Sequence, residues 1–119
     1  MFLSFVKLWP LLIVFGGGEN ERAICERLAP KYEAACEVLL WDHSRCDLVN
    51  ARYAIEVDWA PKWPEAVGQT SYYAILLDRE PAILLLVRNW KTELRYVMRA
   101  QIVCAKLGIR LFIEEIGVD

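Results

Sequence analysis

The pattern of hydrophobic and polar positions after residue 19 predicts a helix followed by three short strands. Residues 19–35 are rich in Glu, Arg, Ala and Leu, which favours a helix that is interrupted at Pro30. Three apolar segments come next, and polar turns separate them. The segments are residues 36–41, 45–49 and 53–59, and the turns are residues 42–44 and 50–52. Short turns of this kind join neighbouring antiparallel strands.

The second half of the chain alternates strands with longer helices. Residues 62–78 show helical spacing, and the wholly apolar run at 82–87 is typical of a fully buried strand. A helix is expected over residues 90–107, ended by Gly108, and a last strand over residues 109–113. Strands joined through a helix run parallel. The expected class is therefore α/β, a three-layer sandwich around a mixed sheet that combines an antiparallel meander with a parallel strand-helix-strand unit.

Composition excludes several classes of protein. The chain has 119 residues, of which 56% are hydrophobic, so it can form one domain with a substantial core and is neither disordered nor collagen-like. The net charge of −2 excludes a globally basic nucleic-acid binder. Four scattered cysteines without a CxxC pair argue against a disulfide scaffold and a structural zinc site. The single histidine, His43, is interpreted as a turn residue.

Residues 1–18 form a separate segment with two interpretations. Lys7 precedes the apolar run LWPLLIVF and three glycines follow it, which resembles a bacterial export signal. The alternative is a buried strand followed by a glycine turn. The run is too short to span a bilayer comfortably, so no stable membrane span is expected. The protein would be exported to the periplasm or secreted if the segment is a signal, and cytoplasmic otherwise; residues 19–119 form a single domain in either case.

The strand expected over residues 53–59 places two acidic side chains on one face. Because side chains alternate across a strand, Glu56 and Asp58 share a face and the apolar residues between them point to the other. Two such carboxylates repel each other and resist burial, unless a hard cation such as Mg²⁺ or Mn²⁺ binds them. Asp47, on the preceding strand, approaches them if the two strands form a hairpin. The pattern predicts a metal site of Asp47, Glu56 and Asp58; the alternative is a solvent-exposed strand face.

Two further rows of polar side chains lie on the expected helices. Lys62 and Gln69 fall along the edge of the packing surface of the helix that follows the acidic strand. A lysine there can neutralise a carboxylate cluster, although a lysine that snorkels at the core rim gives the same pattern. In the helix over 90–107, a basic row recurs every four residues beside an apolar row. Lys91, Arg95 and Arg99 make up the basic row, which predicts either a surface that follows a phosphate backbone or a solvated helix face.

Taken together, these segments resemble the PD-(D/E)XK nuclease superfamily, which has the restriction-endonuclease-like fold. The resemblance rests on residues 45–47, 53–59, 62–69 and 72–74. It is strongest to small bacterial and phage members with an AIEVD…KW.EA.GQ…YYA core, several of which are preceded by an export leader. The match covers residues 45–74 well, and residues 82–113 agree in the order of elements.

The resemblance implies a role for each matching residue. Asp47 matches the lone aspartate of the motif and Glu56 its (D/E), and both would bind Mg²⁺ or Mn²⁺. Gln69 matches a glutamine that faces the site in related nucleases. One position departs from the motif, because the lysine should fall at position 58 and Asp58 stands there. Lys62 is then expected to supply the amine from the helix start, as in members in which that lysine has migrated.

The expected function is metal-dependent hydrolysis of phosphodiester bonds in nucleic acid, with DNA favoured over RNA. Asp47, Glu56 and Asp58 would hold ions that polarise the phosphate and activate a water. Lys62 would stabilise the developing negative charge, and Gln69 would orient groups around it. The alternative is a catalytically inactive module of the same fold that binds nucleic acid or a protein partner, and the replacement of the motif lysine by Asp58 favours it.

Overall fold

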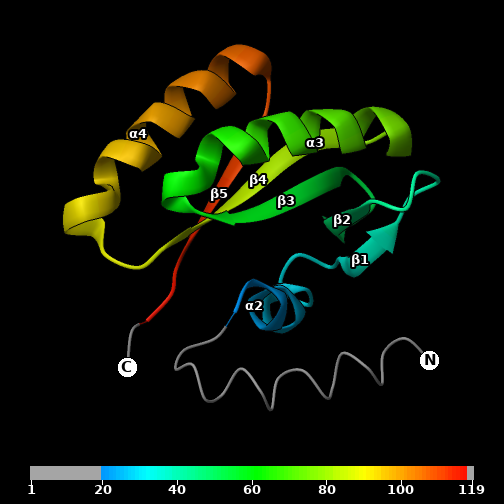
Figure 1. Ribbon diagram of the computed structural model, residues 1–119, viewed down its shortest axis with the longest axis horizontal. Coiled ribbons are helices and arrows are strands. Elements are labelled where there is room, and N and C mark those ends of the chain that lie inside the picture. The colour runs from blue at the N-terminus through cyan, green and yellow to red at the C-terminus, as the bar shows by residue number, and fades with distance from the viewer. Residues whose placement is uncertain (1–19, 118–119) are drawn as a thin grey trace.

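A five-stranded mixed sheet forms the centre of the molecule, and helices cover both of its faces (Figure 1). The computed structural model describes residues 20–117, so the export-signal interpretation of residues 1–18 lies outside the described residues. The strands are β1 (Ala35–Leu39), β2 (Arg45–Val49), β3 (Tyr53–Trp59), β4 (Glu80–Val87) and β5 (Arg110–Glu115). The helices are α2 (Glu21–Leu28), the 3₁₀ turn η2 (Ala60–Lys62), α3 (Trp63–Leu77) and α4 (Trp90–Leu107).

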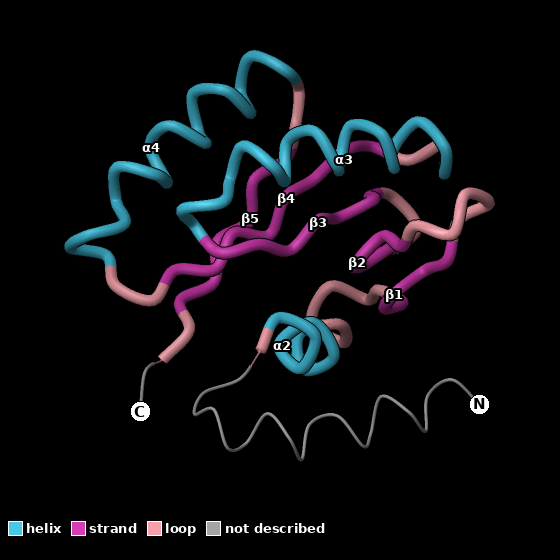
Figure 2. The backbone as a smooth tube through the Cα atoms, viewed as in Figure 1, coloured by secondary structure: helices cyan, strands magenta, loops and turns pink. Residues whose placement is uncertain are grey.

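The strand order follows the chain from β1 to β5. β1, β2 and β3 pair antiparallel, whereas β3, β4 and β5 pair parallel. The two parallel connections run through α3 and α4, which lie on the same side of the sheet, and α2 lies on the other side (Figure 2). This arrangement confirms the expected α/β class with an antiparallel meander and a parallel unit. Within residues 20–117, none of the helices combines the length and the apolar character that crossing a membrane requires.

Most helices and strands begin and end within a few residues of their predicted bounds, and the exceptions have local causes. The interruption predicted at Pro30 is confirmed, because α2 ends at Leu28, but the helix does not resume over residues 31–35. Pro30 has no N–H to continue the helical bonding, and it disfavours helical geometry in the residue before it. The chain turns over residues 29–33 as a result. β4 and β5 each extend two residues beyond the ends expected from the apolar pattern, at Glu80 and Glu115, because parallel pairing continues past the apolar run.

The central strand β4 is apolar on both faces because both faces are covered. All six residues from Ala82 to Val87 are fully buried. Leu84 and Leu86 pack toward α2, whereas Ile83 and Leu85 pack toward α3 and α4. Full burial of such a side chain contributes roughly 1.5–3 kcal/mol. All four cysteines are free, and three of them are buried in this apolar surrounding.

A buried hydroxyl fixes α3 over the parallel strands. Thr70 is fully buried. Its Oγ1 accepts a hydrogen bond from the N–H of Ala82 at 3.0 Å and lies 2.9 Å from the carbonyl oxygens of both Ala54 and Ala82. These contacts join α3 to β3 and β4 at one point. The helix is thereby held so that its polar row faces the acidic side of β3.

Candidate active site

The site begins where β2 and β3 separate. Their backbone pairing covers Leu48 opposite Ile55 and Val49 opposite Ala54. Beyond these two pairs, a side chain replaces a backbone carbonyl as the acceptor. Oδ2 of Asp47 accepts a hydrogen bond from the N–H of Val57 at 2.9 Å. The N–H of Asp47 donates to Oε1 of Glu56 at 3.4 Å. The two acidic residues are therefore held side by side at the fork of the sheet.

A pocket of about 260 Å³ opens at this fork, between the meander, α3 and the first turn of α2. The structure places all of the expected core residues of the site in its wall: Asp47, Glu56, Asp58, Lys62 and Gln69. The remaining lining residues are Glu21, Arg45, Val57, Glu65 and Tyr73. Side chains from α2, β2, β3, η2 and α3 thus meet in one cavity.

The first carboxyl pair of the pocket is Glu56 with Asp47. Glu56 is 5% exposed. Burial, and then the neighbouring Asp47 carboxylate, raise the pKa of Glu56 to about 9. Burial also raises the pKa of Asp47 to about 6, although the hydrogen bond from Val57 opposes this. Glu56 therefore carries a proton at neutral pH and donates it in a hydrogen bond to Asp47.

The second carboxyl pair joins α2 to β3. Glu21 stands in the first turn of α2 and shares a hydrogen bond with Asp58. Burial and the charge of Asp58 raise the pKa of Glu21 to about 7. Burial raises the pKa of Asp58 as well, and the hydrogen bonds from the Trp59 N–H, at 2.9 Å, and from Glu21 work against that rise. The pocket thus holds more acid than it can keep ionised without a counter-charge.

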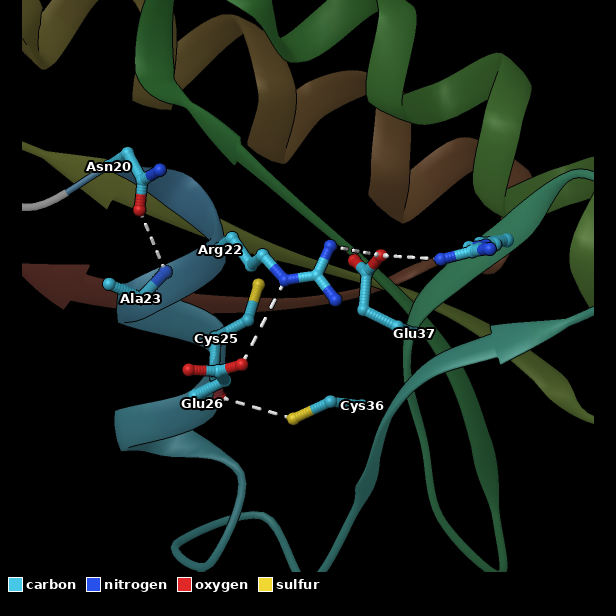
Figure 3. A network of polar contacts seen from close by, with 8 residues as sticks. Asn20, Arg22, Ala23, Cys25, Glu26, Cys36 and Glu37 are labelled. Carbon is cyan, nitrogen blue, oxygen red and sulfur yellow. Dashed lines mark hydrogen bonds and ion pairs between the residues drawn. The ribbon is translucent and has the colours of Figure 1, made fainter. Parts of the chain in front are cut away.

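A network of ion pairs fixes the helix that carries Glu21 (Figure 3). The Asn20 side chain caps α2 by accepting a hydrogen bond from the N–H of Ala23 at 2.9 Å. One turn of the helix presents Arg22 to Glu37 of β1, with 3.2 Å between Nη1 and Oε1. The same Glu37 oxygen lies 4.0 Å from Nη1 of Arg45. Glu37 therefore links the start of α2 to the strand that carries Asp47.

The donor set fits a hard divalent cation in its chemistry, but it does not form a ready-made shell. Carboxylate oxygens are the ligands that Mg²⁺ and Mn²⁺ prefer. Among residues 20–117, however, no three acidic, histidine or cysteine side chains are already grouped around a common point for a metal ion. The four acids instead form two hydrogen-bonded pairs, Glu56 with Asp47 and Glu21 with Asp58, and burial raises the pKa of every member, so that each pair holds a proton more readily than isolated carboxyls would. A bound cation would take over the charge compensation that these protons supply.

Lys62 and Gln69 line the pocket from η2 and α3. Lys62 ends η2 directly before α3, and its positive charge opposes the rise in pKa that burial causes in Glu21 and Asp58. Within the described chain Lys62 makes no ion pair of 4.0 Å or less with a carboxylate. Lys62 therefore lies in the pocket wall and affects the carboxyl groups through its charge.

The basic row on α4 does not line the pocket. Arg95 and Arg99 lie over the ring of Tyr96, at 4.9 and 5.9 Å from its centre. The apolar row beside it is also exposed, by 47%, 52% and 70% for Leu94, Met98 and Ile102. α4 packs on the sheet through a third row, Val97, Ala100 and Cys104. The outer face of α4 is therefore both basic and apolar.

Five residues of the pocket wall were not predicted as members of the site: Glu21, Arg45, Val57, Glu65 and Tyr73. Glu21 follows an Asn helix cap, and an acid in the first turn is ordinary at a helix start. Nothing in the hydrophobic pattern indicates that this turn reaches the fork between β2 and β3.

A comparison of the chain with models of known protein families, with curated proteins and with solved structures found no match.

Proposed function

We propose that this protein is a divalent-metal-dependent nuclease with a restriction-endonuclease-like fold. The observation that carries the proposal is the convergence of Asp47, Glu56 and Gln69, together with Asp58 and Lys62, in one pocket. These residues come from two strands, a 3₁₀ turn and a helix, and a merely solvated strand face would not need to bury Glu56 and Asp58. The mixed sheet and its element order are compatible with that fold.

The residues of the pocket have distinct roles in this proposal. The carboxyl groups of Asp47, Glu56 and Asp58 hold Mg²⁺ or Mn²⁺. Glu21, which is hydrogen-bonded to Asp58, is close enough to serve as a further ligand of the ion. The bound ion supplies polarisation of the scissile phosphate and a water of lowered pKa. Lys62 stabilises negative charge that develops on the phosphate, and Gln69 offers an amide for hydrogen bonds in the same cavity.

The substrate in this proposal is nucleic acid, with DNA favoured over RNA. The basic row of α4 would follow the phosphate backbone outside the pocket. Double replacement of Arg95 and Arg99 by Glu should then weaken binding and lower the slope of log K against log salt by about one for each lost phosphate contact. An unchanged slope would show that this face of α4 does not touch phosphate.

Cleavage assays test the proposal directly. Wild-type protein with Mg²⁺ or Mn²⁺ should cut plasmid or single-stranded DNA, and EDTA should stop it. Glu56→Ala and Asp47→Asn should each lose at least about a hundredfold in rate, as expected for loss of a group that acts at the reacting phosphate. Glu80→Gln is the matched control, because Glu80 is an exposed acid that pairs with Arg52 away from the pocket.

One observation favours the second candidate function, an inactive module of the same fold. Position 58 carries an aspartate where the motif has a lysine, and Lys62 makes no direct contact with a carboxylate in the part of the chain described. Nucleic-acid binding without cleavage under any of these metal conditions would support the module and overturn the nuclease.

A further inference from the structure

An exposed tryptophan stands on a rigid turn at the rim of the pocket. Trp41 lies between β1 and β2 and is 77% exposed. Backbone hydrogen bonds close the turn, from the N–H of His43 to the carbonyl of Leu40 at 3.0 Å and from the N–H of Leu40 to the carbonyl of Ser44 at 2.9 Å. His43 takes a φ of 72°, as a tight turn requires. The indole is therefore presented to solvent on a backbone that is already ordered.

Side-chain contacts bind this turn to α3. The carboxylate of Asp42 accepts hydrogen bonds from the Ser44 N–H, at 3.1 Å, and from the Tyr72 hydroxyl. The Ser44 hydroxyl donates to the same carboxylate and has the largest effect on its pKa. Together these hydrogen bonds lower the pKa of Asp42 to about 2, so the acid stays ionised and keeps its partners at any physiological pH. The tie to α3 holds the turn at a fixed place relative to the pocket.

The residues on either side of the turn locate it at the pocket's edge. Leu40 is buried against Tyr73 and Ala74 of α3, and Tyr73 also lines the pocket. On the other side of the turn, Arg45 begins β2 and lines the pocket too. The turn that carries Trp41 therefore lies next to the Tyr73 end of the cavity, and Trp41 itself is not part of the pocket wall.

An exposed, ordered indole beside a phosphate-handling pocket has a specific use. In a duplex the faces of the bases are covered by their neighbours, whereas a single strand offers free faces for stacking on an aromatic ring. We infer that Trp41 stacks on an unpaired base of single-stranded nucleic acid while the adjacent phosphate lies at the pocket. This inference rests on the proposed function and names its substrate class: single strands rather than duplex.

Binding of defined oligonucleotides tests the inference. Wild type, Trp41→Ala, Trp41→Phe and Trp41→Leu are titrated into a labelled single strand of about 12 nucleotides, a length within the range that single-strand binding sites cover, and into the matching blunt duplex. Ca²⁺ is present and the oligonucleotide is checked for integrity on a gel. Trp90→Ala is the control, because Trp90 is also an exposed tryptophan but begins α4, a helix that contributes no residue to the pocket. Circular dichroism establishes that each variant is folded.

The expected result is a selective loss. Trp41→Ala should weaken single-strand binding roughly 5- to 100-fold, the range expected for one stacked base. Trp41→Phe should retain most of the affinity, Trp41→Leu should not, and duplex binding should stay unchanged in all of them. Unchanged single-strand binding by Trp41→Ala, or an equal loss for single strand and duplex, would overturn the inference.

The same experiment separates this inference from the proposed function when Mg²⁺ or Mn²⁺ cleavage is measured in parallel. Metal-dependent cleavage by wild type together with no effect of Trp41→Ala on single-strand binding refutes the stacking role and leaves the nuclease standing. Trp41-dependent single-strand binding without cleavage supports the stacking role and refutes the nuclease. Absence of binding to either oligonucleotide refutes both.

Discussion

Replacing Glu56 by glutamine should stabilise the metal-free protein, although Glu56 is proposed to act in the site. Its carboxyl is 5% exposed and its pKa is raised by burial to about 9. A glutamine at this position would keep both contacts of the native side chain, because an amide can donate to the Asp47 carboxylate and accept from the Asp47 N–H. The substitution removes the ionisable group without removing its hydrogen bonds.

The size of the effect follows from proton linkage. The folded protein holds the Glu56 proton up to about pH 9, whereas an unfolded chain releases it near the ordinary glutamate pKa of 4.5. The contribution of the Glu56 proton to the free energy of unfolding is complete below the pKa of the unfolded chain. It is therefore lost as the pH rises toward the pKa of the folded protein, by up to about 1.4 kcal/mol for each pH unit. Between about pH 5 and pH 8 this sets an upper limit of ~4 kcal/mol. Relaxation of the pocket should reduce the observed gain of Glu56→Gln at pH 8 to about 1–3 kcal/mol.

Urea denaturation in EDTA at about pH 5 and at about pH 8, the two ends of that window, measures this difference. Glu56→Gln should match wild type at the acidic end and exceed it at the basic end, and added Mg²⁺ should stabilise wild type alone. Glu80→Gln controls for the loss of an exposed acid. A variant that is less stable than wild type at both pH values, or a difference that does not depend on pH, would refute the assignment of Glu56 as a buried acid that keeps its proton.

Three further predictions concern the same region. Mg²⁺ at about ten times its dissociation constant should stabilise wild type by ~1.4 kcal/mol, seen as a rise in melting temperature of a few degrees that Asp47→Asn abolishes; no shift at millimolar ion would count against the metal site. Lys62→Ala should lower the cleavage rate on the order of a hundredfold while changing stability by less than about 1 kcal/mol, and an unchanged rate would exclude Lys62 from the chemistry. Thr70→Val should cost about 1–3 kcal/mol in unfolding free energy, because it leaves buried backbone groups of β3 and β4 without their partner; urea denaturation beside Thr92→Val, an exposed control, tests it.

The fold was predictable where one physical cause dominates the pattern. The run at 82–87 has no polar residue because both faces of β4 are covered, so its strand assignment needed no tertiary information. α4 follows its 3.6-residue period and its Gly108 stop, which adopts a φ of 72°. The interruption of the first helix at Pro30 was predicted from the backbone geometry of proline, whereas the expected helix over residues 31–35 was wrong, because good helix propensity there does not prevent the chain from turning into β1.

The site was predictable only where it follows the strand period. Glu56 and Asp58 share a face because side chains alternate, and Asp47 comes opposite Glu56 because the hairpin turn sets the register. The splaying of β2 from β3 is a property of the sheet in three dimensions, with Asp47 accepting the Val57 N–H in place of a backbone carbonyl. The contribution of Glu21 depends on where α2 docks, which follows from burial of Ile24, Cys25 and Leu28 in the core, with the Arg22–Glu37 ion pair beside them.

The role of Asp58 can be tested with two variants, because its carboxyl group makes two kinds of contact. Oδ1 accepts a hydrogen bond from the Trp59 N–H at 2.9 Å, where β3 passes into the 3₁₀ turn that ends at Lys62. The same carboxyl shares a hydrogen bond with Glu21 in the pocket. Asp58→Asn keeps an oxygen for the Trp59 N–H and removes the charge, whereas Asp58→Ala removes both.

The two variants therefore separate a metal ligand from a local cap. If Asp58 holds the cation, Asp58→Asn should lose metal-dependent stabilisation and most cleavage while the metal-free protein unfolds like wild type. If it only shapes the turn before Lys62, Asp58→Asn should behave as wild type in both assays and Asp58→Ala should lose about 1 kcal/mol of stability, the usual net value of one hydrogen bond. Equal metal responses in wild type and Asp58→Asn would remove Asp58 from the metal site and leave Asp47 and Glu56 as its ligands.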